Sequence, residues 1–192
     1  MKQQLVLGLS FLLFTLTACQ AVNAEVEQNE IKPKQLSENE YELLEVITDY
    51  GVWIDVGQLN QSKQVKIGMD YYIDGERVEE GFEMTPDPNH PIQSILIALN
   101  INGENNDQLD GIVQVNDDEG MVRTNFNQVL PVFEHMGHAS IELYGEGVLI
   151  NEVEKTFIGS YQIGEDITPI ELNDIESMQS PGHLLAFYIE YE

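Results

Sequence analysis

The sequence predicts an all-β protein built as an antiparallel sandwich, and three observations support this prediction. Short segments in which apolar and polar residues alternate recur from about residue 41 to the C-terminus. A period of two is typical of half-buried strands. Turn-forming residues separate these segments at short spacing, as in sandwiches. The stretch 92–101 is mostly apolar and β-branched, which indicates a central strand covered on both faces. About nine strands are expected.

The clearest local prediction is a hairpin over residues 65–84. The odd-numbered positions from Val65 to Ile73 are apolar, and Asp74-Gly75 follows them. Asp-Gly is a preferred two-residue hairpin turn. A turn at this place puts residue 73 opposite residue 76, and the pairing of every other residue of the two strands follows from this pair. The expected apolar pairs are Val65 with Met84, Ile67 with Phe82, and Tyr71 with Val78.

The remaining strands are expected in short segments along the rest of the chain. Thr85 to Pro91 is rich in proline and is expected to form a loop within one domain, and Glu171 to Met178 a short helical turn. The expected strands are 92–101, 111–116, 121–126, 139–143, 148–150, 153–163 and 185–191.

The N-terminus has the pattern of an export signal. Lys2 precedes an apolar run from Leu5 to Leu16, which is too short to cross a bilayer as a helix but fits the core of a signal peptide. The run ends in Leu16-Thr17-Ala18-Cys19, which resembles the lipobox of bacterial lipoproteins. The resemblance implies cleavage after Ala18 and a diacylglycerol on Cys19, which would hold the protein on the outer side of the cell membrane. An ordinary signal peptide and a buried core cysteine are the alternatives.

These patterns divide the chain into three parts: a signal peptide at 1–18, a lipidated N-terminus and disordered tether at 19–39, and one sandwich domain at 40–192. The tether prediction rests on the absence of aromatic residues and the few apolar ones in residues 20–39. Ser37 to Glu40 has the capping-box pattern, which predicts a short helix through Ile47. The sequence YELLEVI also suits a strand.

The composition is strongly acidic, with 34 Asp and Glu against 8 Lys and Arg and a net charge of −26. Nucleic-acid binding is excluded on this ground, because phosphates require a positive surface. Anionic headgroups would also repel the domain. Cys19 is the only cysteine, so no disulfide is expected.

The stretch VLPVFEHMGHASIELYGEGVLI, residues 129–150, resembles a recurring piece of immunoglobulin-like domains in bacterial surface proteins. In those domains a loop with Pro and Phe leads to a Gly, an alternating strand, a tight turn and a return strand. The resemblance implies an immunoglobulin-like sandwich rather than a barrel. The Cys…Trp…Cys framework of antibody domains is absent.

Two candidate metal sites follow from residue type. Glu134, His135 and His138 could bind zinc or copper, although Gly137 favours a turn and exposed loop histidines are the alternative. Residues 100–111 and 116–120 are rich in oxygen ligands for calcium. Neither segment matches an EF-hand loop, and Asn, Asp and Gly equally suit β-turns.

Aromatic residues offer a candidate ligand-binding face for a sugar or a peptide. Trp53 is the only tryptophan, and Tyr72 falls on the polar side of its hairpin. Strand aromatics also serve packing alone.

The expected function is that of a lipid-anchored, extracytoplasmic, non-enzymatic protein that binds or supports a protein or cell-wall component of the envelope. No nucleophile-elbow, Walker or dinucleotide motif is present, so no catalytic residue is assigned and no cofactor is expected. The alternative is a surface lipoprotein that binds zinc, copper or calcium.

The lipobox prediction is tested by Cys19→Ser. We expect this variant to lose metabolic labelling with a fatty acid, because the thiol that receives the diacylglycerol is gone. It should also be released or remain an unprocessed precursor. Lipid labelling that persists in Cys19→Ser would contradict the prediction.

Overall fold

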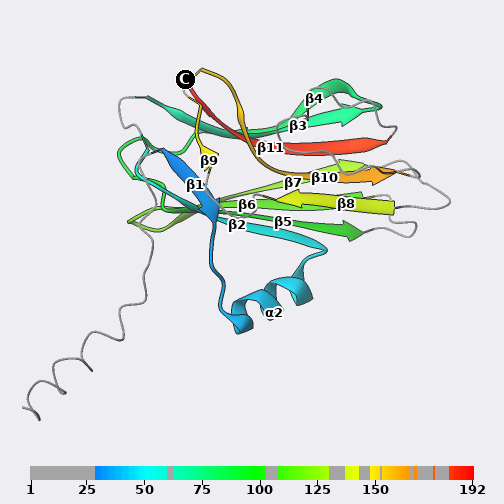
Figure 1. Ribbon diagram of the computed structural model, residues 1–192, viewed down its shortest axis with the longest axis horizontal. Coiled ribbons are helices and arrows are strands. Elements are labelled where there is room, and N and C mark those ends of the chain that lie inside the picture. Colours follow the sequence, from blue (N-terminus) through cyan, green and yellow to red (C-terminus); the bar gives the residue numbers. More distant parts are fainter. Residues whose placement is uncertain are drawn as a thin grey trace, which may run out of the picture.

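Two antiparallel β-sheets lie face to face and make up most of the described chain (Figure 1). This computed structural model describes residues 29–59, 63–102, 108–129, 137–142, 148–151, 153–164, 167, 175 and 182–192. Eleven strands and one helix lie within these ranges. The predicted all-β sandwich is confirmed, with two more strands than expected.

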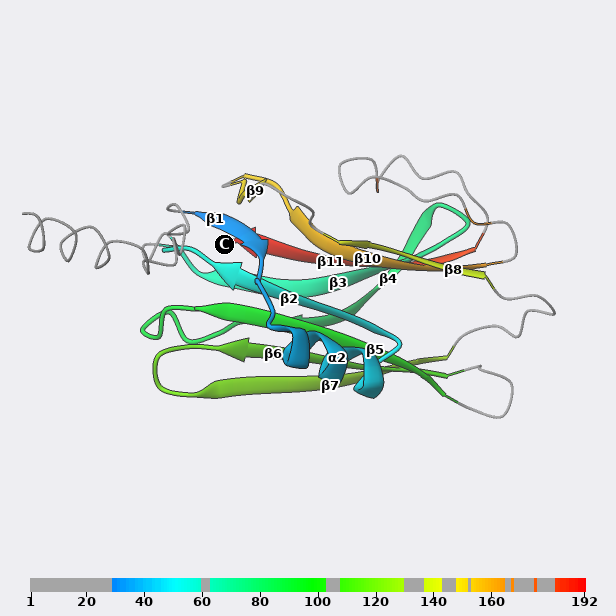
Figure 2. The same cartoon turned by 60° about the horizontal axis from the view of Figure 1, so that its bottom comes forward.

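The first sheet has six strands and carries the helix on its outer face. Helix α2, Glu38–Ile47, lies outside both layers next to this sheet (Figure 2). The strands, in spatial order, are β7 (Met121–Val129), β6 (Gln108–Asn116), β5 (Ser94–Asn102), β2 (Tyr50–Val56), β1 (Glu30–Pro33) and β9 (Val148–Leu149).

The second sheet has five strands, and its hairpin β3–β4 forms one edge. The strands expected from the sequence are found in both sheets with ends shifted by a few residues. The order in the second sheet is β4 (Glu76–Met84), β3 (Val65–Ile73), β11 (His183–Tyr191), β10 (Thr156–Gly164) and β8 (Gly137–Glu142).

The immunoglobulin-like arrangement expected from residues 129–150 is not confirmed. A constant-type immunoglobulin domain divides seven strands into sheets of four and three. Here the described sheets hold six and five strands. Residues 130–136 and 143–147 of that stretch lie outside the described residues. The supported description is therefore a β-sandwich.

Strand β1 corrects the predicted tether. Residues 30–33 belong to the first sheet, where Ile31 lies opposite Val56 of β2 and Val148 of β9. The Ile31 side chain is fully buried. The strand is held by one buried isoleucine and by backbone pairing with β2 and β9. Backbone pairing leaves no trace in amino-acid composition, so the sequence did not predict this strand. The folded domain therefore begins about ten residues earlier than expected.

The predicted capping box and its helix are confirmed. The amide of Glu40 donates to Ser37 Oγ at 3.4 Å, and the amide of Ser37 donates to Glu40 Oε2 at 2.8 Å. The stretch 38–47 is therefore a helix and not the alternative strand. Strand β2, which follows it, is not among the strands expected from the sequence.

The predicted hairpin has the expected turn but a different register. Asp74 and Gly75 both have positive φ, 50° and 83°, as a type I′ turn requires. Two irregularities in the pairing then shift the strands by two residues. Met69 therefore lies opposite Phe82 and Ile67 opposite Met84. The shift brings Met69 to an apolar partner in place of Glu80.

The displaced residue of this hairpin is Val78, which is 49% exposed instead of facing Tyr71 in the core. Its expected pairing is wrong because the first irregularity occurs between the turn and Tyr71. The neighbouring Gly81 leaves room for Met69, since a Cβ at position 81 would overlap the Met69 side chain.

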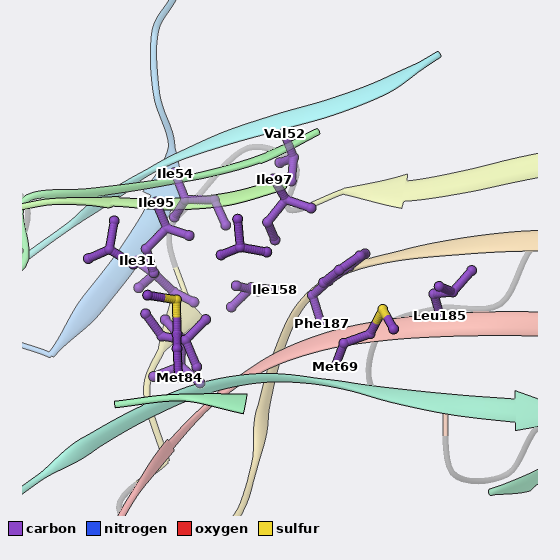
Figure 3. Close-up of a cluster of buried hydrophobic side chains, with 14 of the residues drawn as sticks. Ile31, Val52, Ile54, Met69, Met84, Ile95, Ile97, Ile158, Leu185 and Phe187 are labelled. Carbon is purple, nitrogen blue, oxygen red and sulfur yellow. The ribbon is translucent and has the colours of Figure 1, made fainter. Parts of the chain in front are cut away.

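The core lies between the inner faces of the two sheets (Figure 3). Ile54, Ile95 and Ile97 of the first sheet lie across from Met69, Ile158 and Phe187 of the second (Figure 3). These side chains are all fully buried. Strand β5 is central, as expected, and Ala98 on its other face is also buried.

Three phenylalanines pack where the sandwich closes between β4 and β7. The ring centroids of Phe82 and Phe126 are 5.1 Å apart, and Phe187 lies 6.5 and 6.3 Å from them. A Cβ at Gly111 would overlap the Phe126 ring, so glycine is needed beneath it. This aromatic cluster joins both sheets at one side of the core.

The outer face of the second sheet carries a buried ion cluster. Asp70 is 2% exposed, and its carboxylate accepts from Arg77 Nη2 at 2.7 Å and from Lys155 Nζ at 2.7 Å. The Lys155 ammonium also lies 3.9 Å from the ring centre of Tyr188. The buried charge is thus paired on both sides, which offsets its loss of hydration.

The same outer face buries Tyr72. Its neighbours are Leu184, Ala186 and Ile175, and all three are buried. Of the helical turn expected at 171–178, only Ile175 lies within the described residues. The polar side of the hairpin is therefore a second packed surface and not an exposed one.

Phe187→Ala should destabilise the sandwich strongly, because it removes a fully buried ring from the contact between the sheets. We expect the free energy of unfolding to fall by about 3–5 kcal/mol, measured by urea denaturation. Val153→Ala is the matched control, since Val153 is 88% exposed and such changes stay within about 0.5 kcal/mol. Equal effects of the two substitutions would contradict this description of the core.

Candidate ligand-binding groove beneath helix α2

An open groove of about 660 Å³ lies between helix α2 and the outer face of β2. Its residues come from the end of β1, the linker to the helix, one side of the helix and the outward positions of β2. The lining residues include Lys34, Tyr41, Leu44, Glu45, Thr48, Asp49, Gly51 and Trp53. We refer to this feature as the α2 groove.

The alternation of β2 places Trp53 on the groove side of the sheet. Tyr50, Val52 and Ile54 are buried in the core, so the residues between them point to the opposite face. Trp53 is half-buried there. Its Nε1 atom is buried and has no hydrogen-bond partner among the described residues. Because Nε1 is buried, a ligand in the groove would meet the exposed part of the indole ring rather than this N–H.

Lys34 packs against the same indole. Its Nζ lies 3.6 Å from the centre of the Trp53 ring, which is a cation–π contact. The Lys34 amide also donates to the Trp53 carbonyl at 2.7 Å. The chain between β1 and α2 is therefore fastened to β2 at the point where the groove begins.

The helix approaches β2 closely at Gly51. A Cβ at Gly51 would lie 2.8 Å from the Leu44 side chain, so glycine is what admits this contact. Leu44 is half-buried, and no residue of α2 is buried. The helix thus stands above the sheet and leaves the groove open beside the contact.

The C-terminal end of the helix is held by Thr48. Its amide donates to the Leu44 carbonyl at 3.1 Å. Its Oγ1 donates to the Leu99 carbonyl at 2.7 Å and accepts from the Tyr50 amide at 3.1 Å. The Ile101 amide donates to Asp49 Oδ2 at 2.7 Å. These bonds tie the helix end to β2 and β5.

The helix side of the groove is acidic. The sequence of α2 contains four glutamates and no basic residue. Hydrogen bonds from the Ser37 side chain and backbone lower the pKa of Glu40. Partial burial raises the pKa of Asp55, the next outward residue of β2, against the opposing effect of Lys34 and Lys32. A ligand would meet aromatic and apolar surface bordered by carboxylates, which is the chemistry of a binding site.

The structure does not bring the two predicted aromatic site residues together. Trp53 lies on the outer face of the six-stranded sheet, whereas Tyr72 is buried on the outer face of the other sheet. Sequence alternation placed Tyr72 on the polar side of its hairpin, but the strand that carries Trp53 was not predicted. Alternation could not show that the two belong to different sheets, or that other residues cover Tyr72.

The predicted zinc or copper site lies largely outside the described residues. Glu134 and His135 are not among them. Only the backbone of His138 is described; it belongs to β8 and lies opposite Ile163 of β10. Cys19 also lies outside. Within the described ranges, no three His, Cys, Asp or Glu residues are arranged to hold a metal ion. These site assignments remain predictions.

The acidic segment at 116–120 forms the turn between β6 and β7. Asp117 Oδ1 accepts from the amides of Glu119 and Gly120 at 2.9 and 2.7 Å, which is the local role that Asp plays in turns. Residues 103–107 of the other acidic segment are not described. Calcium binding at either segment remains a prediction.

Sequence reasoning missed most of the groove because Lys34 fell within the expected tether. The capping box at Ser37 signalled the helix, but nothing local signalled where the helix would lie.

Across the described part of the chain, no helix is long and apolar enough to cross a membrane.

The structure defines a β-sandwich domain with an open groove on the outer face of one sheet. The chain belongs to the YgaN domain family, whose match covers residues 30–188. The match begins at the first residue of β1, in agreement with the domain start seen in the structure. Comparisons with curated proteins and with solved structures gave no match.

Gly51→Val should lift α2 from the sheet, because the added side chain would overlap Leu44. We expect faster amide hydrogen exchange over residues 41–47 and altered Trp53 fluorescence, with β5 exchange unchanged. Gly120→Val is the control, since nothing lies within 4 Å of a Cβ there. Unchanged exchange in α2 would contradict the close contact.

Proposed function

We propose that this chain is a lipid-anchored, non-catalytic binding protein of the cell envelope, and that the α2 groove is its ligand site. The observation that carries the proposal is the open groove between α2 and β2, which is lined by the half-buried Trp53 together with Tyr41 and Leu44. Open grooves with aromatic surface and a few polar groups are the usual form of a binding site.

The lipobox pattern at Leu16 to Cys19 supports anchoring at the outer side of the membrane. Ten residue steps separate Cys19 from Asn29, where the described domain begins. A chain of that length spans at most about 35 Å. The domain would therefore work close to the headgroups, nearer than a tether reaching to residue 39 would allow.

The residues of the groove favour ligand binding over catalysis. The Trp53 ring can stack on a ligand, Leu44 offers apolar surface, and the Glu45 carboxylate can accept hydrogen bonds. The partner would be an envelope protein or a cell-wall component within reach of the anchored domain. The net charge of −26 argues against nucleic acid.

A photoreactive amino acid at position 45 tests the proposal in intact cells. Glu45 lines the groove and is exposed on α2, so the replacement should not disturb the fold. We expect a discrete crosslinked product with an envelope component, reduced by Trp53→Ala. The matched control is the same replacement at Val153, which is exposed and far from α2 in the sequence.

Crosslinking that is equal at positions 45 and 153, or absent at both, would contradict the assignment of the groove. The unfolding midpoint of Trp53→Ala is measured in parallel to show that the variant is folded. Fatty-acid labelling of Cys19→Ser tests the anchor separately.

A further inference from the structure

We propose that two copies of this chain associate through the open edge of strand β7. This strand is the last one of the six-stranded sheet, and Figure 2 shows it as the lowest strand of that sheet. On one side it pairs with β6 through nine consecutive residue pairs without an irregularity. None of the described strands pairs with its other side. This edge is separate from the α2 groove, because β5 and β6 lie between β7 and β2.

The turn that precedes β7 shows which of its backbone groups face the open side. The Asp117 amide donates to the Gly120 carbonyl at 3.1 Å, so these two residues form a hydrogen-bonded pair. Hydrogen-bonded and non-hydrogen-bonded pairs alternate along an antiparallel ladder. The even-numbered residues of β7 therefore bond to β6. The odd-numbered residues from Met121 to Val129 direct their N–H and C=O groups away from β6, toward the open side.

An exposed strand edge normally carries features that prevent pairing with another chain, and the other edge strands of this protein have them. Strand β4 contains four glutamates, and its pairing with β3 has two irregularities. Strand β8 has six residues and β9 only two. By contrast, β7 has nine residues without a proline, a glycine or a carboxylate, and Arg123 is its only charged residue. It is therefore a long edge that leaves pairing open.

The residues of β7 match those of a second copy in one antiparallel register. With a two-fold axis through Asn125, the outward backbone groups of both strands meet in five pairs with two hydrogen bonds each. About ten hydrogen bonds is the usual number in a protein interface. Arg123 would lie opposite Asn127 of the second copy, and Met121 opposite Val129. The strands would thus meet without like charges, and Met121, which is 65% exposed, would gain an apolar neighbour.

Self-complementarity favours a second copy as the occupant of this edge. A two-fold contact uses the same surface on both subunits, so that surface must fit itself, and the register through Asn125 meets this condition. The four glutamates of each α2 helix are kept from the contact by β5 and β6. The net charge of −26 still opposes the approach of two copies. Salt should therefore strengthen self-association, whereas it would weaken the attraction of a basic partner.

Sedimentation equilibrium of the purified protein measures this association. We expect a monomer–dimer equilibrium that becomes tighter between about 0.01 M and about 0.15 M NaCl, where the screening length falls from about 30 Å to about 8 Å. Amide hydrogen exchange locates the contact. The amides of Arg123, Asn125 and Asn127 should exchange more slowly as the protein concentration rises, because they gain bonding partners in the dimer. The amide of Val153 serves as the control and should not change.

Opposite charges placed at position 125 test the symmetry axis. Asn125→Lys and Asn125→Glu should each weaken self-association at least tenfold, because like charges opposite each other destabilise a strand pair. A mixture of the two variants should restore the dimer, since opposite charges then meet. Gln58→Lys and Gln58→Glu are the controls at an exposed position after β2. They should change the dissociation constant less than twofold, alone or mixed.

Three results would overturn the proposal. The first is a wild-type protein that stays monomeric at the higher salt up to about 1 mM. The second is a dimer that neither replacement of Asn125 weakens. The third is a mixture of the two Asn125 variants that does not associate, although the thermal unfolding of each variant shows that it is folded.

A photoreactive amino acid at position 125 tests the occupant in intact cells. A crosslinked product with twice the mass of the chain would support the two-fold contact, and the same replacement at position 58 should not give it. A product with a different protein, without the double-mass product, would overturn the proposal in favour of a strand added by that protein.

Discussion

Contact between the two apolar inner faces is the constraint on which the rest of the structure depends. Ile97 on one sheet and Phe187 on the other are both fully buried in the same core. Because strand residues alternate between faces, using one set of residues for this core points the other set outward. The outward set differs between the sheets: one carries Trp53 beneath a helix, and the other carries Asp70 within a buried ion cluster.

The groove exists because the N-terminal part of the chain joins the first sheet before the helix forms. Strand β1 pairs with β2, so the chain that leaves Pro33 starts beside Trp53 and Lys34 can pack on the indole. The chain then returns through α2 to the start of β2, where Thr48 bonds to Leu99. The helix is thus held at both ends and touches the sheet closely at Gly51. These contacts join the helix to the sheet although none of its residues is buried.

The same arrangement connects the fold to the proposed role. An apolar surface left in water normally favours association, and on α2 it is accompanied by glutamates that oppose association between copies of an acidic protein. The proposed anchor on Cys19 would add a further restriction, because the chain up to Asn29 is short. A ligand for the groove would then be met near the membrane.

Local signals in the sequence determined the features that depend on neighbouring residues. The period of two indicated an all-β protein, Ser37 to Glu40 marked the start of α2, and Asp74-Gly75 marked a hairpin turn, because alternation, capping and turn geometry act over a few residues. Only the tertiary structure decided the rest. Ile31 became a strand residue through Val56 and Val148, the hairpin shifted so that Met69 faces Phe82, and Tyr72 was covered by Leu184 and Ile175. These outcomes depend on partners far apart in the chain, so the free energy that selects them appears only when the two sheets pack together.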